Sequence, residues 1–288
     1  MAIDAKLVAE LRRRTGLPMM KCKQALVDGD GDIEKAEERL RKEVHKTIDK
    51  LKGREMKEGL AFTHAGDEGV AAVAVLCETD FVARSGDFTA FGETLAKALY
   101  ANAPAERGDG DSLASVGLAD GRTVAEHLEE LVGRKVRENM MVGSFACFKT
   151  GQGYVANYVH HNGKIACLVE LSGETLGEHE PVRTLGNELG MQIAFHAQLR
   201  ALTNDELDAE WVAKEREIYL AQVQDMPEER REKIAEGKLA KRLKEVVLLD
   251  QPFIKNEKES VKQHVAAVAK EAGTAIEVLR FARIAAGA

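Results

Sequence analysis

An apolar strand pattern followed by an amphipathic helix pattern occurs twice in this chain, and this repeat constrains its fold more than any other feature. The segment VAVLCETD leads into FTAFGETLAKAL, and further along ACLVELSG leads into VRTLGNELGMQI, with Phe91-Gly92 aligned on Leu185-Gly186. An apolar sheet face and an apolar helix stripe stabilise a fold by packing on one another. The repeat therefore predicts an α+β core made of two related halves with antiparallel sheets.

Further strand patterns surround the repeat. A β-hairpin is predicted from GLAFTH, a Gly-rich turn at 66–69 and VAAVAVLCE. Three later segments, MMVGSFACFK, GYVANYVH and KIACLVEL, predict a three-strand meander in which Asn162-Gly163 is a strong hairpin signal. Helices are expected between these strands, one at 123–136 and one whose buried face carries Phe88, Phe91, Leu95 and Leu99.

The first 55 residues predict a module of three short helices. Asp4 can cap the first helix, Pro18 fits the first turn of the second, and Asp32 can cap the third. Their inner faces would carry the apolar residues Leu7, Val8, Leu11, Met19, Cys22, Leu26, Ile33, Ala36 and Leu40. A core of this size is typical of a satellite module rather than of a main domain.

The segment 203–247 predicts a helical hairpin. Pro227 divides it, and proline fits the start of a second helix better than the interior of one long helix. The sequence leaves open whether the apolar stripe of this hairpin packs on the core, on its own mate or on a second copy of the protein in a homodimer. A final helix is expected near 260–270, ahead of a short hydrophobic tail.

These patterns divide the chain into five parts. We expect a helical N-terminal module (1–55), the first half of the core (56–152), its second half (153–202 and 248–263), an inserted helical hairpin (203–247) and a C-terminal helical tail (264–288).

Charge argues against one broad class of function. The net charge is −7, whereas a sequence-independent nucleic-acid binder needs an excess of Lys and Arg to displace counterions. Basic residues do concentrate between 39 and 57, where eight Lys or Arg accompany three Asp or Glu. This run is either a solvated helix or linker, or a basic face that docks an acidic partner surface.

The chain reads as a cytosolic, soluble protein. Its four cysteines are scattered among apolar neighbours, as expected of small core residues in a reducing compartment. No stretch approaches the ~20 apolar residues that span a bilayer, so no membrane association is expected. The N-terminal segment MAIDAKLVAEL lacks a signal-peptide pattern, and its acidic residues argue against a transit peptide.

The motifs of common enzymes and metal sites are missing or incomplete. The spacing Asp28-x-Asp30-x-Asp32 resembles a calcium loop, but Ile33 and Arg39 stand where that loop needs Gly and Glu. The adjacent pair His160-His161 would point to opposite faces of a strand and so could not share one ion. There is no phosphate-binding loop, dinucleotide fingerprint or nucleophile elbow. We therefore expect no cofactor, no metal and no covalent chemistry, and favour an interaction protein.

The segment Cys77 to Arg84, CETDFVAR, allows two interpretations. In one, Asp80 caps the next turn and Phe81 fills the core. In the other, Phe81 is an exposed wedge with a carboxylate beside it, presented on a loop to a partner.

Ordered motifs along the whole chain resemble those of the elongation factor Ts family. LRRRTGLPMMKCKQAL at 11–26 is similar to that family's N-terminal pattern, although Lys21 replaces its usual acidic residue. GDIEKA at 31–36 and TDFVA at 79–83 match intact, and near the C-terminus Glu236-Gly237, a basic helix and Gln251-Pro252-Phe253 follow in the family's order.

The resemblance implies a guanine nucleotide exchange factor that binds the GDP-bound GTPase elongation factor Tu, destabilises Mg²⁺ and phosphate binding, and so releases GDP. It also implies a UBA-like N-terminal module. The implied wedge residues are Thr79, Asp80, Phe81 and Val82. The implied supporting contacts are Arg12, Met19, Met20, Val132, Gly133 and His160.

Two other classes of function remain open. An RNA-binding accessory protein could use the basic run and Arg134-Lys135, but the aromatic platforms of such surfaces are lacking, so no direct nucleic-acid contact is expected. A metabolic enzyme would need a clustered catalytic site, which the sequence does not indicate.

Overall fold

The computed structural model describes residues 3–151, 153–173, 177 and 179–287, and its chain forms two compact units. The first unit contains residues 1–64, 73–145 and 285–288, and the second contains 65–72 and 146–284. Mixed helices and antiparallel sheets make the fold α+β, as the repeated strand-to-helix order predicts.

The N-terminal module is a bundle of three helices, α1 (Ala5–Thr15), α2 (Met19–Asp28) and α3 (Ile33–Leu51). Asp4 and Asp32 cap α1 and α3 as predicted, because each side chain accepts hydrogen bonds from the first free backbone N–H groups of its helix. The predicted apolar faces form its core, with Leu11, Cys22 and Leu26 fully buried. The placement of Met19 on the inner face was wrong, because Met19 lies in the first turn of α2 and is 52% exposed. Helix α3 is longer than expected, so most of the basic run is helical.

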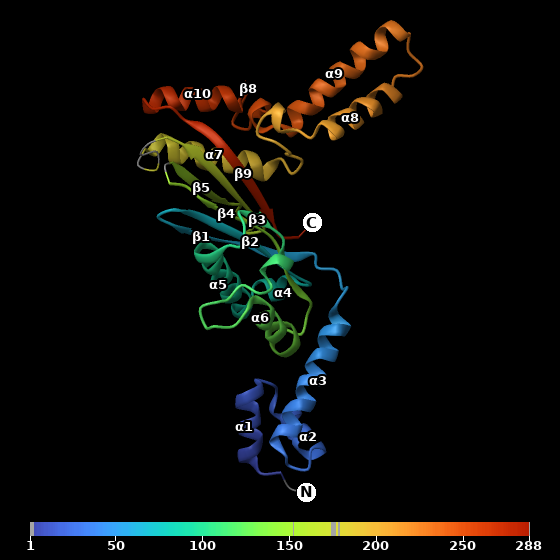
Figure 1. The fold of residues 1–288 in the computed structure, drawn as a ribbon, viewed down its shortest axis with the longest axis vertical. Coiled ribbons are helices and arrows are strands. Elements are labelled where there is room, and N and C mark those ends of the chain that lie inside the picture. Colours follow the sequence, from blue (N-terminus) through green and yellow to red (C-terminus); the bar gives the residue numbers. More distant parts are fainter. Residues whose placement is uncertain (1–2, 152, 174–176, 178, 288) are drawn as a thin grey trace. The chain divides into compact units, whose positions relative to one another are not determined.

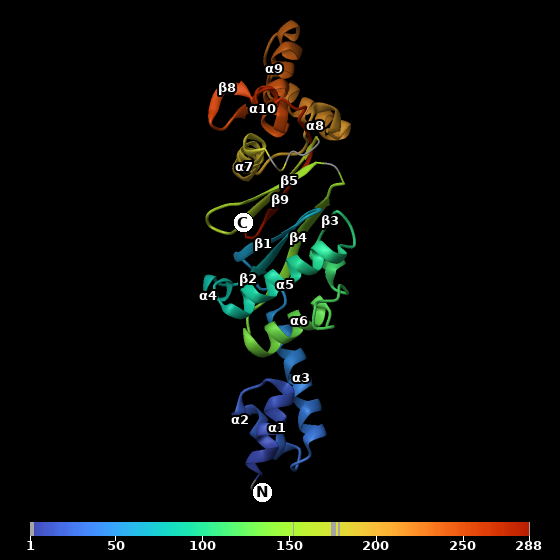
Figure 2. The same ribbon diagram turned by 90° about the vertical axis from the view of Figure 1, so that its left-hand side faces the viewer.

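The first sheet has the strand order β1-β2-β4-β3. The predicted hairpin is present as β1 (Glu58–Gly66) and β2 (Gly69–Cys77), joined by two residues, while β4 is Met140–Lys149 and β3 is Arg107–Gly108. On one face of this sheet lie α4 (Asp80–Ala83), α5 (Gly86–Asn102) and α6 (Val124–Glu130), as Figures 1 and 2 show. Helix α5 buries the predicted residues Phe88, Phe91, Leu95 and Leu99.

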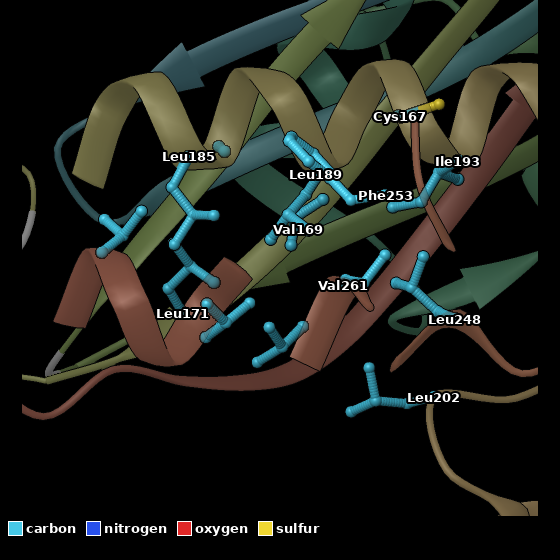
Figure 3. Packing of buried hydrophobic residues seen from close by; sticks show 14 of the residues in the cluster. Cys167, Val169, Leu171, Leu185, Leu189, Ile193, Leu202, Leu248, Phe253 and Val261 are labelled. Carbon is cyan, nitrogen blue, oxygen red and sulfur yellow. The ribbon is translucent and has the colours of Figure 1, made fainter. Parts of the chain in front are cut away.

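The second sheet has the strand order β5-β6-β9. Strands β5 (Tyr154–Val159) and β6 (Ile165–Ser172) form the antiparallel hairpin that the Asn-Gly signal predicts, and β9 is Glu277–Ala285. Helix α7 (Glu180–Phe195) packs on this hairpin. Figure 3 shows the apolar cluster beneath α7, in which Leu185, Leu189 and Ile193 meet residues of β6 and of the segments that follow the helical hairpin.

Two predictions about this second sheet were wrong. The expected meander does not form, because β4 pairs with β2 in the first sheet and only β5 and β6 pair with each other. The C-terminal tail is not helical: the last helix, α10 (Val261–Ala272), is followed by β9. Val278, Ala282 and Ile284 are buried at even spacing along β9, and this period of two is that of a strand rather than of a helix.

The two halves of the core share one connectivity. In each, a hairpin is followed by a helix, and a later strand joins the second strand of the hairpin: β1, β2, α5, then β4, and β5, β6, α7, then β9. The aligned glycines occupy equivalent places, since a Cβ on Gly92 would lie 2.2 Å from the ring of Phe62 on β1, and one on Gly186 would lie 2.4 Å from Ala156 on β5. Both glycines let a helix approach the first strand of its hairpin.

The inserted segment forms the predicted helical hairpin, α8 (Ala209–Ala221) and α9 (Glu228–Val246), which lie side by side (Figure 1). Pro227 stands at the N-cap of α9, as expected. The two ends of the hairpin meet, because Arg200 N–H donates to the Val246 carbonyl at 2.9 Å and Ala201 forms a bridge with Val247. Strands β7 (Pro252–Phe253) and β8 (Asn256–Ser260), which the sequence patterns missed, connect it to α10.

The four cysteines are free thiols in the core, as expected. Burial raises the pKa of Cys77 to about 11 and that of Cys167 to about 12, so both remain protonated and unreactive near neutral pH.

Helix α10 begins with a capping box. The Ser260 hydroxyl accepts from the Gln263 N–H, and the Gln263 side chain accepts from the Ser260 N–H at 2.8 Å. We expect Ser260→Ala to lower the free energy of unfolding by about 1 kcal/mol, the usual value of an N-cap. Urea denaturation would measure the loss, and Ser260→Asp, which keeps an acceptor, should restore most of it.

Candidate functional site

The loop-to-helix segment at the end of β2 is held by buried and hydrogen-bonded neighbours. Thr79 caps α4, because its hydroxyl accepts from the Val82 N–H, and the same hydroxyl donates to Glu138 at 2.9 Å. On the inner face of α4, Val82 and Ala83 are buried. This short helix is therefore fixed at its cap and along its inner face.

Phe81 stands on the outer face of α4 with 84% of its surface exposed. The interpretation in which Phe81 fills the core and Asp80 caps the turn is therefore wrong, since Thr79 is the cap. Asp80 lies beside Phe81 and pairs with Arg84 at 3.1 Å, a contact that is itself largely exposed. Phenylalanine is enriched in the cores of protein–protein interfaces, and an exposed ring on a fixed helix is therefore a candidate anchor for a partner.

The N-terminal module carries a second set of exposed apolar side chains. Met19 and Met20 open α2 and are 52% and 72% exposed, and Val27 is exposed further along the same helix. Arg12 is exposed on α1. These residues are accessible in the first unit, as a binding role for them would require.

Val132 and Gly133 have a different environment from the other predicted contact residues. They belong to a π-helical turn, η2 (Leu131–Lys135), which continues α6, and both are buried. A Cβ on Gly133 would lie 2.4 Å from Val44 Cγ1 of α3. In this structure both residues are shielded from solvent, and Gly133 lies against α3 of the N-terminal module.

His160 lies just after β5 in the second unit and is half-buried. Its Nδ1 hydrogen-bonds to the Tyr158 hydroxyl at 2.9 Å, and its ring centroid lies 4.2 Å from that of His161. The expectation that the two histidines point to opposite faces was wrong, because β5 ends at Val159 and the next residues turn, with Gly163 N–H donating to the His160 carbonyl.

The sequence patterns did not indicate the structural roles of two residues in this region, Glu138 and Arg134, and named Arg134 only as a basic residue of a possible RNA-binding surface. Glu138 anchors the Thr79 cap from 59 residues away, and Arg134 donates to the Thr15 carbonyl at 2.9 Å across 119 residues. Contacts between residues so far apart in the sequence produce no local periodic pattern from which they could be predicted.

A charged cluster at the start of α6 lies apart from Phe81. Asp120 accepts from Arg122 at 2.8 Å and lies 3.0 Å from His127 Nε2, and Arg122 also pairs with Glu130. The bond with His127, followed by those with Arg122, holds the pKa of Asp120 well below its ordinary value of 3.8.

This cluster predicts a specific dependence of stability on pH. Because the folded-state pKa of Asp120 is depressed, its contribution is fully present above pH ~4 and is lost as the pH falls towards the lower folded-state pKa. We expect Asp120→Asn to flatten the acid limb of a plot of unfolding free energy against pH between about 4 and 2. An unchanged acid limb in the variant would contradict this assignment.

Within the described residues, no group of three or more His, Cys, Asp or Glu side chains could hold a metal ion. None of the helices in the described part of the chain is both long and apolar enough to span a membrane.

Comparison with known proteins supplies the family. The family model described as "Elongation factor TS" matches residues 78–288. The chain is 39% identical to "Elongation factor Ts" of Clostridium botulinum (strain Alaska E43 / Type E3) over 289 residues, covering 99% of this chain and 93% of that protein. It is 37% identical to "Elongation factor Ts" of Lawsonia intracellularis (strain PHE/MN1-00) over 296 residues, covering 100% and 99%. At this identity and coverage, the chain belongs to the elongation factor Ts family.

Proposed function

We propose that this protein is the guanine nucleotide exchange factor of elongation factor Tu, and that it binds the GDP-bound GTPase and loosens its hold on Mg²⁺ and the GDP phosphates. Membership of the elongation factor Ts family supports the general activity, because that family is the nucleotide exchange factor for elongation factor Tu. Like the family, it would carry out no covalent chemistry itself.

The observation that carries the mechanistic proposal is the exposure of Phe81 on a fixed helix. An aromatic ring that is 84% exposed while its own helix is capped by Thr79 and buried at Val82 can enter a partner without unfolding its frame. We assign Phe81 as the wedge, with Asp80 beside it, Thr79 and Val82 as its frame, and Arg12, Met19, Met20 and His160 as further contacts. Val132 and Gly133 support the site from within the first unit.

The charged surface gives no comparable support to RNA binding. Arg39, Lys42 and Lys52 of the basic run pair with Asp28, Glu38 and Asp49. Lys135 pairs with Asp87 and Glu130, and Arg134 donates to a backbone carbonyl. Cations engaged in this way are less available to displace counterions from a phosphate backbone.

Thermodynamic linkage sets the test of this function. A factor that weakens GDP binding must itself bind more weakly, by the same ratio, when GDP is present. We expect the protein to accelerate release of fluorescent GDP from elongation factor Tu in stopped-flow mixing, and to bind the nucleotide-free GTPase more tightly than the GDP-bound form. Equal affinity for both forms, or no acceleration, would rule out the proposal, because a ligand with equal affinity for two states shifts neither.

A further inference from the structure

The π-helical turn η2 brings three consecutive residues inside the first unit. The Val136 N–H donates to the Leu131 carbonyl at 2.8 Å, an i to i+5 bond that widens the last turn after α6. Leu131, Val132 and Gly133 are all buried, although consecutive residues of a regular helix point about 100° apart. Single π-helical turns of this kind occur frequently where a protein has a functional constraint.

Gly133 is the point at which α3 of the N-terminal module approaches this turn. A Cβ there would lie 2.4 Å from Val44 Cγ1 and 3.3 Å from Ile48 Cδ1. Since real Cβ atoms essentially never approach other heavy atoms within 3.0 Å, any side chain at 133 must displace the Val44 side chain, α3 or the turn. Val44 is 2% exposed and belongs to the core of the module, so it has little room to move.

Arg134, the next residue, is bonded to the end of α1. Its Nη1 donates to the Thr15 carbonyl at 2.9 Å, and Thr15 is itself buried. The C-terminal end of a helix carries free carbonyls and partial negative charge, which suit a guanidinium. The Arg134 Nε is buried and has no hydrogen-bond partner in the described residues, so the side chain is held by this geometry at some desolvation cost.

From these contacts we propose that η2 is a latch that holds the N-terminal module on the first half of the core, with Gly133 as the seat of α3 and Arg134 as its bond to α1. Arg134 is a positioning residue, because its bond to α1 fixes the exposed face of Met19 and Met20 relative to Phe81. Gly133 positions α3 in the same way, in addition to the partner contact that the resemblance implies for it. The inference rests on the proposed exchange function for its kinetic consequence, but the latch itself can be measured on the protein alone.

The variants are chosen so that a clash can be made and then relieved. Gly133→Ala introduces the clashing Cβ, and Val44→Ala removes the Cγ1 that it would meet, so the double variant should fit again. The control is Gly117→Ala, at a glycine of the same unit where a Cβ would meet nothing within 4 Å. Arg134→Gln removes the bond to Thr15, whereas Arg134→Lys keeps a cationic donor and should recover part of the contact.

Hydrogen exchange on the full-length protein measures how firmly η2 holds the N-terminal module, and it needs no partner protein. We expect amides of α3 around Val44 and Ile48 to exchange about tenfold faster or more in Gly133→Ala and Arg134→Gln, and near the wild-type rate in the double variant and in Gly117→Ala. Unchanged exchange in both single variants would overturn the proposal, whether or not the protein proves to release GDP.

Stimulated GDP release then separates positioning from direct contact. In Arg134→Gln, a loosened module should raise the half-saturating concentration of the factor by about tenfold, while the maximal rate at saturation stays within about twofold of wild type. Arg134→Lys should recover part of the wild-type half-saturating concentration. If Arg134→Gln lowers the maximal rate instead and Arg134→Lys gives no recovery, then Arg134 acts on the GTPase directly and the latch is wrong.

Discussion

Phe81→Ala should slow stimulated GDP release by roughly 30- to 1000-fold while leaving the protein folded. A buried aromatic anchor contributes ~2–4 kcal/mol to an interface, and each ~1.4 kcal/mol is a factor of ten. In the free protein the ring is 84% exposed, so its loss should change the free energy of unfolding by less than ~0.5 kcal/mol. Stopped-flow release of fluorescent GDP from elongation factor Tu measures the first effect, and urea denaturation measures the second.

A matched control is Phe195→Ala, which removes another exposed phenylalanine, 73% accessible at the end of α7, from a position with no assigned role. We expect its release rate to stay within about threefold of wild type. Phe81→Leu should lie between the two, because it keeps apolar bulk and loses ring area. A folded Phe81→Ala protein with wild-type release would remove Phe81 from the mechanism and leave family membership intact.

The largest expected effect on stability is at Gln192, a fully buried amide on α7. Its Nε2 donates to Gln251 Oε1 at 2.9 Å and to the Pro252 carbonyl at 3.1 Å, and its Oε1 accepts from the Ile254 N–H at 2.7 Å. Gln192→Leu would leave these partners without their bonds in the core. Each unsatisfied buried group costs about 1–3 kcal/mol, so we expect a total loss of about 3 kcal/mol or more.

Urea denaturation and hydrogen exchange of the Pro252–Phe253 strand and of Ile254 would check this loss. The matched control is Gln222→Leu, at an exposed glutamine whose side-chain oxygen accepts from Lys238 Nζ at 3.0 Å, and it should lie within ~0.5 kcal/mol of wild type. Equal stability of the two variants would show that the Gln192 bonds contribute little beyond what water supplies to the unfolded chain.

Local sequence patterns predicted most of the secondary structure, because helix caps, helix breaks and turns are determined by neighbouring residues. The caps at Asp4 and Asp32, the helix break at Pro227 and the Asn162-Gly163 turn all depend on residues within one or two turns of each other. The repeat of strand and helix predicted two halves, and the glycines that it aligned, Gly92 and Gly186, do lie at equivalent helix–strand contacts.

Pairing between distant segments was not predictable in the same way. The sequence of β4 reads as a strand whichever sheet receives it, so nothing local indicated that it would pair with β2 rather than β5. Likewise, β9 pairs with β6 about 110 residues earlier in the chain, and nothing in its own nine residues indicates that partner.

The candidate site likewise has one part that the local sequence predicts and one part that depends on distant residues. The motif around Asp80-Phe81 is contiguous, so the sequence could indicate an exposed wedge as one of two interpretations, and the exposure of Phe81 decides between them. The burial of Gly133 against α3 depends on a helix about 90 residues earlier, which no spacing in the sequence indicates.

Because the two ends of the helical hairpin lie side by side, the hairpin is an insertion whose length is independent of the core. The chain leaves the second half of the core at Arg200-Ala201 and returns to the same point at Val246-Val247, where hydrogen bonds join the two. Length added to or removed from the far end of α8 and α9 therefore changes neither the strand order β5-β6-β9 nor the path of the core chain. We therefore expect the core to keep its fold when the hairpin is shortened, without redesign of the sheet.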